Sequence, residues 1–144
     1  MKKQKTVYIG LSADNLHHGH MRLLEKARDY GDIIVGLLTD EAIATYKRLP
    51  YLKYDQRKQI LLNLKGVKKI VPQKVQDYSN NIKMLKPDYM IHGDDWKKGY
   101  MSEFRKNCIK VLNSYGGKLI EFPYTKGVSS AAYISHLNNL SITP

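Results

Sequence analysis

Short apolar runs alternate with stretches of helical periodicity along the whole chain. Five runs have the length of strands: residues 7–9, 32–38, 67–71, 89–92 and 118–122. Residues 32–38 are apolar on both faces, as in a central strand of a parallel sheet. Residues 101–115 place apolar side chains at steps of three and four, which predicts a helix with one buried face. The alternation predicts right-handed βαβ units and therefore an α/β fold.

A doubly wound sheet is the arrangement that such units favour. We expect a three-layer, Rossmann-like α/β architecture of about five parallel strands, with helices on both faces. In such sheets, ligands bind beyond the carboxyl ends of the strands, at the point where the strand order reverses. The residues that directly follow each strand are therefore the first candidates for a functional site.

Length and cysteine usage narrow the class of protein. A chain of 144 residues is one domain by length, and we expect that domain over residues 1–140, with 141–144 as a tail or the start of a linker. Cys108 is the one cysteine, so no internal disulfide can form and a reducing cytoplasm fits. No apolar run approaches the roughly 20 residues that span a bilayer. We therefore expect a cytoplasmic chain with no membrane partner.

The sequence is strongly basic, with a net charge of +11 from 24 Lys and Arg against 13 Asp and Glu. Two partner classes fit: nucleic acid, whose phosphates basic surfaces neutralise, and a small polyanion in a basic cleft. Nucleic-acid modules usually present an aromatic platform or a recognition helix with clustered cations. The sequence shows neither, so we expect no nucleic-acid partner. A non-catalytic nucleotide- or nucleic-acid-binding domain stays open as the alternative of another class.

The turn after the first strand has the composition of a phosphate site. It contains Gly10, Leu11, Ser12, Asp14, His17, Gly19 and His20. An amphipathic helix follows, and the free N–H groups and positive dipole end of a helix start attract anions. Gly19 has no side chain to keep a ligand from the backbone. The imidazoles of His17 and His20 can both reach one polyphosphate at this spacing.

Cations follow the second strand and open the next helix. Lys47 and Arg48 lie on a loop, because Pro50 ends any helix there. A lysine above a phosphate site stabilises charge that moves onto a leaving group. Arg57 stands near a predicted helix start, where the dipole disfavours a cation, which indicates a phosphate contact.

Acidic residues and the only tryptophan follow the fourth strand, in the run His92, Gly93, Asp94, Asp95 and Trp96. The carboxylates would hold a divalent metal on a triphosphate or accept hydrogen bonds from a base or sugar. Trp96 would form one wall of the pocket. The structural alternative is an acidic turn with Trp96 tucked onto the core.

Hydrogen-bond donors follow the fifth strand. Glycine and two serines at a predicted helix start offer N–H and O–H groups that suit phosphate oxygens. The candidates are Tyr124, Thr125, Gly127, Val128, Ser129 and Ser130.

The pattern His17-x-Gly19-His20, after a strand and before a helix, resembles the signature of the nucleotidyltransferase superfamily. From about residue 6 to 136, the motifs and their order resemble the small bacterial, glycerol-phosphate cytidylyltransferase-like enzymes. More narrowly, residues 36–52 and 123–130 look like the cytidylyltransferase domain found N-terminal to phosphoenolpyruvate mutase in phosphonate biosynthesis. That resemblance implies transfer of CMP from CTP to a small phosphonate, such as 2-hydroxyethylphosphonate, with release of pyrophosphate.

The resemblance also implies cofactors, partners and residue roles. Mg²⁺ would be coordinated by the triphosphate, without direct protein ligands. A homodimer would be expected, and the chain would be fused to a phosphoenolpyruvate mutase or work with one. The alternative acceptor is glycerol 3-phosphate or another phospho-alcohol, and the residues alone do not separate CTP from ATP. The implied catalytic residues are His17, His20 and Lys47, and the implied acceptor-binding residues are Lys47, Arg48 and Arg57. The implied nucleotide-binding residues are Gly10, Leu11, Ser12, Asp14, Gly19, His92, Gly93, Asp94, Asp95, Trp96, Tyr124, Thr125, Gly127, Val128, Ser129 and Ser130.

Overall fold

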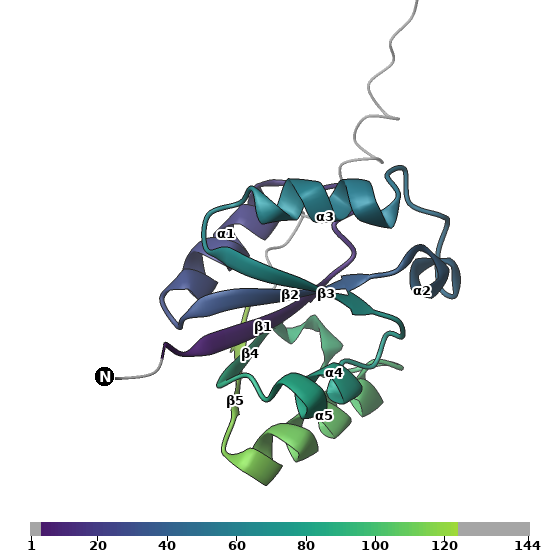
Figure 1. Ribbon diagram of the computed structural model, residues 1–144. Coiled ribbons are helices and arrows are strands. Elements are labelled where there is room, and N and C mark those ends of the chain that lie inside the picture. Colours follow the sequence, from purple (N-terminus) through teal and green to yellow (C-terminus); the bar gives the residue numbers. More distant parts are fainter. Residues whose placement is uncertain (1–3, 124–144) are drawn as a thin grey trace, which may run out of the picture.

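Five parallel strands form a sheet between two layers of helix in the computed structural model, which describes residues 4–123 (Figure 1). The strands are β1 (Thr6–Leu11), β2 (Asp32–Leu38), β3 (Val67–Gln73), β4 (Tyr89–Gly93) and β5 (Lys118–Phe122). The helices are α1 (His18–Arg28), α2 (Asp40–Ala44), α3 (Tyr54–Leu62), α4 (Ser79–Leu85), α5 (Ser102–Tyr115) and the 3₁₀ turn η1 (Asp94–Trp96). The predicted doubly wound α/β architecture is confirmed.

The strand order is β3-β2-β1-β4-β5, so the chain starts in the middle of the sheet, fills one side and then fills the other. The order reverses between β1 and β4. β1 pairs with β2 along its whole length, whereas its pairing with β4 is confined to Val7 and Tyr8. At the amino-terminal edge of this junction, the Thr6 N–H donates to the Asp88 carboxylate at 2.8 Å. Ligands in such sheets bind at the carboxyl ends of the two strands that flank the reversal.

Each face of the sheet has its own hydrophobic core. On the face that α1 and α3 cover, Ile9 and Ile33 of the strands pack with Ala27 and Leu61 of the helices (Figure 1). On the face that α4 and α5 cover, the core contains Tyr8, Met90, Cys108 and Leu112. Burial raises the pKa of the Cys108 thiol to about 12, so this cysteine packs as an apolar group and is a poor nucleophile at neutral pH.

Two glycines in neighbouring strands make room for two buried tyrosines. A Cβ at Gly36 of β2 would overlap the Tyr8 hydroxyl, and a Cβ at Gly10 of β1 would overlap the ring of Tyr78. The Tyr8 hydroxyl donates to the Gln73 side chain and accepts from Asn81 at 3.1 Å. Gly10 is therefore required for packing against Tyr78.

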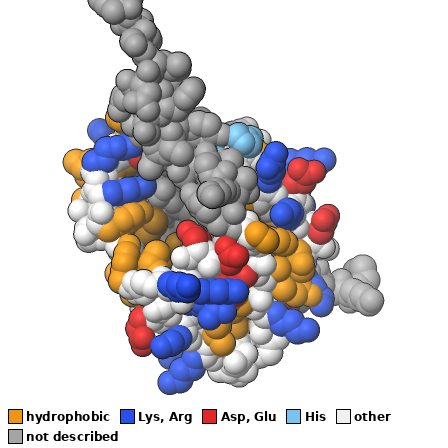
Figure 2. Space-filling model, turned by 180° about the vertical axis from the view of Figure 1, so that it is seen from behind, with side chains coloured by type: hydrophobic (Ala, Val, Ile, Leu, Met, Phe, Trp, Pro, Cys, Tyr) orange, Lys and Arg blue, Asp and Glu red, His pale blue; other side chains and the backbone are white. Residues whose placement is uncertain are grey.

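Cationic side chains are spread over the face of the molecule that Figure 2 shows. On the face in Figure 2, Lys and Arg side chains lie among acidic and hydrophobic ones and do not gather in one patch. Within the described part of the chain, no helix has the length and apolar character needed to cross a bilayer.

Candidate active site

The turn after β1 fixes the two motif histidines through backbone hydrogen bonds. His17 is the N-cap of α1, and its Nδ1 accepts the Gly19 N–H at 3.1 Å. His20 reaches back, and its Nδ1 accepts the His17 N–H at 3.2 Å. This is a capping box, with histidines in place of the usual Ser and Glu. The two ring centroids lie 4.1 Å apart.

These bonds determine where each imidazole carries its proton. A backbone N–H can only donate, so Nδ1 of His17 and of His20 must present a lone pair. The neutral rings then hold their proton at Nε2 and act as donors there. Burial, assisted by the charges of His17 and Lys47, lowers the pKa of His20 to about 4. Burial also lowers the pKa of His17. Two neutral Nε2–H donors therefore stand at the start of α1.

Lys47 joins this group from the loop between α2 and α3. Its Nζ lies 3.5 Å from the Ser12 hydroxyl, and its charge is one of the causes that lower the pKa of His20. Partial burial lowers the pKa of Lys47 itself, against the opposing pull of Asp14. The structure thus brings together three residues expected to be catalytic, from two separate segments of the chain.

Asp14 holds the Lys47 loop against the turn after β1. Its carboxylate accepts the Tyr51 N–H at 2.9 Å and pairs with the Arg48 guanidinium at 2.9 Å. The Asp14 side chain is 3% exposed. The residue before it, Ala13, has φ of 52°, an unusual left-handed conformation for a side chain other than glycine. In this structure, Asp14 and Arg48 bind protein groups, and their predicted ligand contacts remain predictions.

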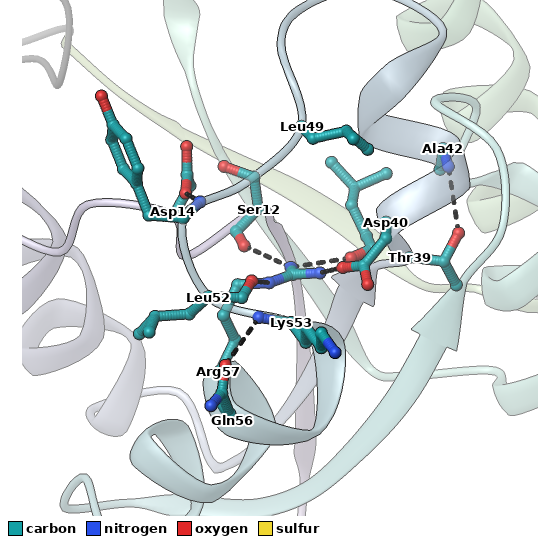
Figure 3. Close-up of polar contacts among 12 residues, drawn as sticks. Ser12, Asp14, Thr39, Asp40, Ala42, Leu49, Leu52, Lys53, Gln56 and Arg57 are labelled. Atoms are coloured by element: carbon teal, nitrogen blue, oxygen red, sulfur yellow. Dashed lines mark hydrogen bonds and ion pairs between the residues drawn. The ribbon is translucent and has the colours of Figure 1, made fainter.

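Arg57 is placed differently from the sequence-based expectation. It is fully buried, and its guanidinium holds three loop segments together (Figure 3). Nη1 donates to the Ser12 and Leu38 carbonyls at 2.6 and 2.8 Å, and Nε donates to the Leu52 carbonyl at 3.0 Å. Nη2 donates to Asp40 at 2.6 Å, in an ion pair. Because these bonds use the guanidinium inside the protein, the expected acceptor contact is corrected to a positioning role.

Trp96 is also placed differently. It was expected to form a pocket wall, but it is 1% exposed and packs in the α4–α5 core. Its Nε1–H donates to Glu121 at 2.7 Å, and the Arg105 guanidinium donates two hydrogen bonds to the same carboxylate, at 2.9 and 3.0 Å. The His92 ring stacks on the indole with centroids 3.7 Å apart and planes 11° apart. Trp96 therefore supports His92 from within the core.

His92 has the opposite hydrogen-bond arrangement from His17 and His20. Its Nδ1 lies 2.8 Å from the carbonyl of Gly93, and a carbonyl can only accept, so Nδ1 carries the proton. The Asp95 carboxylate, 3.9 Å from the same nitrogen, favours the same tautomer. Burial lowers the pKa of His92 and keeps the ring neutral. Asp95 itself is half exposed at the carboxyl end of β4.

The remaining predicted residues divide into two groups. Leu11 is a core residue, the backbone N–H of Gly19 is used by His17, and Asp94 opens the η1 turn. The candidates after β5 lie outside the described residues: Tyr124, Thr125, Gly127, Val128, Ser129 and Ser130. Sequence reasoning missed Tyr78, which fills the space beside Gly10. A glycine in an otherwise apolar strand was the one available signal for such a close approach.

The chain is similar to known proteins along most of its length. A family model described as cytidylyltransferase-like matches residues 8–135. A glycerol-3-phosphate cytidylyltransferase of Bacillus spizizenii is 34% identical over 119 residues, which cover 81% of this chain and 84% of that protein. One from Staphylococcus aureus is 33% identical over 101 residues, covering 69% and 75%. A FAD synthase of Methanopyrus kandleri is 34% identical over 95 residues, covering 63% of each chain.

Solved structures agree on the fold. A lipopolysaccharide core biosynthesis protein from Thermoplasma volcanium superposes with a TM-score of 0.70 at 21% identity, covering 85% of this chain and 100% of that one. A pantoate-beta-alanine ligase from Francisella tularensis superposes with a TM-score of 0.58 at 17% identity, covering 94% and 66%. At these identities the likeness concerns the fold alone.

Proposed function

Since the chain belongs to the cytidylyltransferase-like family and is a CTP-dependent nucleotidyltransferase, we propose that it transfers CMP from CTP to glycerol 3-phosphate or a closely related phospho-alcohol. The observation that carries the choice of acceptor is a set of relatives at 33–34% identity that are named glycerol-3-phosphate cytidylyltransferases. This choice replaces the phosphonate acceptor that the narrower sequence resemblance implied, because the cytidylyltransferase relatives described above are named for glycerol 3-phosphate.

The chemistry is an in-line displacement at the α-phosphorus of CTP. A phosphate oxygen of the acceptor forms the new bond to phosphorus, the bond to the β-phosphate bridging oxygen breaks, and pyrophosphate leaves with that oxygen and its electron pair. The attacking oxygen is already anionic at neutral pH, so no general base is required. Catalysis of such a step consists mainly of positioning and charge stabilisation. Magnesium would arrive as part of the substrate, MgCTP.

His17 and His20 suit this chemistry because Nδ1 of each ring accepts a backbone N–H, so each neutral ring carries its proton at Nε2. Neutral Nε2–H donors can bind phosphate oxygens in the ground state and strengthen those bonds as negative charge grows on the departing pyrophosphate. Lys47 would add a full positive charge beside them, held in place by the loop that Asp14 anchors.

The experiment that tests the acceptor is pyrophosphate release with MgCTP across a panel of glycerol 3-phosphate, phosphocholine, 2-hydroxyethylphosphonate and 2-aminoethylphosphonate. We expect glycerol 3-phosphate, or another phospho-alcohol, to give the highest kcat/KM. Turnover confined to a phosphonate would overturn the acceptor and leave the transfer chemistry standing. Silence across the panel, with MgCTP binding intact, would favour the non-catalytic alternative.

A further inference from the structure

His92 presents a hydrogen-bond acceptor at the carboxyl end of β4. Its one ring proton is at Nδ1 and is engaged by the Gly93 carbonyl, so Nε2 carries a lone pair. Among the described residues, no buried side-chain nitrogen or oxygen lacks a partner, and no contact of His92 uses Nε2. The His92 side chain is 15% exposed. Nε2 therefore lies in the part of the ring that reaches solvent.

The ring that carries this acceptor is rigid. Trp96 stacks on it, Glu121 receives the Trp96 N–H, and Arg105 of α5 holds Glu121. Tyr78 lies beside it, with ring centroids 6.0 Å apart. A ring packed in this way keeps its orientation, so its lone pair is preorganised for a ligand.

The position of His92 fits the base end of a nucleotide. The phosphate-facing histidines follow β1, and His92 lies at the end of β4, across the point where the strand order reverses. A nucleotide whose triphosphate binds at the start of α1 would extend over this junction toward β4. Tyr78 lies between the ends of β1 and β4, because its ring packs against Gly10 and lies beside the His92 ring.

We propose that His92 selects CTP over UTP by accepting, at Nε2, a hydrogen bond from the exocyclic amino group of cytosine. This inference rests on the proposed function and deepens it. At the same position uracil carries a carbonyl oxygen, which would set one lone pair against another and leave both acceptors unsatisfied. ATP also carries an amino group, so this contact excludes UTP and says nothing about adenine.

The test measures binding of MgCTP and MgUTP by calorimetry without any acceptor substrate, so it does not depend on which acceptor is correct. The wild type should bind MgCTP about 10- to 100-fold more tightly than MgUTP, as the cost of leaving acceptors unsatisfied implies. His92→Phe keeps a flat ring against Trp96 but removes both nitrogens. It should weaken MgCTP binding about 10-fold or more, and it should not weaken MgUTP binding, because it also removes the lone pair that opposes the uracil carbonyl.

A second variant guards against a merely structural effect. His92→Gln places an amide near the position of Nε2, and an amide can either accept from cytosine or donate to uracil. It should therefore tighten MgUTP binding and narrow the preference for MgCTP. Equal weakening of both nucleotides in His92→Phe, with an unchanged melting temperature, would overturn the inference. Failure of the wild type to bind either nucleotide would overturn it together with the proposed function, whereas failure of turnover alone would affect only the acceptor.

Discussion

The two ends of the proposed nucleotide site use the same side chain with opposite hydrogen-bond polarity. At the start of α1, backbone N–H groups donate to Nδ1 of His17 and His20, which leaves Nε2 of each ring as a donor. At the end of β4, a backbone carbonyl accepts from Nδ1 of His92, which leaves Nε2 as an acceptor. In all three cases the main chain, through a local bond, sets the chemistry of the outer nitrogen.

The comparison shows that a neutral histidine can serve as a hydrogen-bond donor at one place and as an acceptor at another, without any change in residue type. Oxygen atoms of a phosphate need donors, and an amino group of a base needs an acceptor. The start of α1 supplies N–H groups to His17 and His20, and the Gly93 carbonyl faces Nδ1 of His92, so the local backbone decides whether the outer nitrogen is a donor or an acceptor. Changes that keep the fold but alter one end should therefore affect that end alone.

The largest effect is expected at the phosphate end, from His20→Asn. The amide oxygen of Asn can accept the His17 N–H in place of Nδ1, but the shorter side chain does not reach the outer position of Nε2. The Nε2–H donor is lost, and kcat should fall about 10²- to 10³-fold, as for loss of one oxyanion donor. Steady-state pyrophosphate release gives kcat, and thermal unfolding checks that the melting temperature is kept. Turnover equal to wild type would end the assignment of His20.

Arg57→Met should lower the stability of the protein without changing nucleotide selectivity at the base end. The variant strips a hydrogen-bond donor from the Ser12, Leu38 and Leu52 carbonyls and leaves Asp40 unpaired. The free energy of unfolding should drop by about 2 to 3 kcal/mol, moderated by the partial exposure of Asp40. Urea titration measures this. Because Arg57 supports only the phosphate side, the ratio of CTP to UTP affinity should stay at its wild-type value. A changed ratio would show that the two ends are coupled.

Trp96→Phe probes the support beneath the base end. The stacked ring remains, but the N–H to Glu121 is lost while Arg105 still satisfies that carboxylate. We expect a loss of about 1 kcal/mol in the free energy of unfolding and a drop of a few fold in the preference for CTP over UTP. Arg105→Lys, at the far end of the same chain of contacts, is the matched control and should change the preference less. A larger change in Arg105→Lys than in Trp96→Phe would contradict this order of support.

A further effect concerns pH and His20. Its pKa is lowered to about 4 in the folded state, compared with about 6.5 in an unfolded chain. The folded protein thus holds fewer protons between these values, so the His20 contribution to stability is complete above pH 6.5 and is lost as the pH falls toward 4. Thermal unfolding of the wild type and of His20→Asn at pH 7 and pH 5 should show the larger decrease for the wild type. Parallel curves would mean that His20 does not titrate in this way.

The fold was predictable from sequence because its signals are local. The apolar runs at 32–38 and 118–122 coincide with β2 and β5, and the stripe over 101–115 lies on α5. Each signal is a periodicity read within one segment, and the way the segments connect follows from the handedness of βαβ units.

The site was predictable as a set of loops and less so residue by residue. Arg57 was expected to contact a phosphate because its position near a helix start disfavours a cation. Its actual partners are carbonyls that meet only when β1, β2 and α3 assemble. Trp96 follows a strand just as a pocket residue would, and only the structure shows its ring turned into the core. The polarity of the three histidines depends on hydrogen bonds a few ångströms long, which residue types do not encode.

The junction between β1 and β4 has a consequence for how the molecule forms. It joins residues far apart in the chain, since Thr6 and Asp88, which bond across it, are 82 positions apart. Closing so long a loop is entropically costly and slow compared with pairing β1, β2 and β3, which follow one another in sequence. We therefore expect β4 and β5 to dock last in folding. A bound nucleotide that contacts both β1 and β4 would stabilise the pairing of these two strands, which is the last to form.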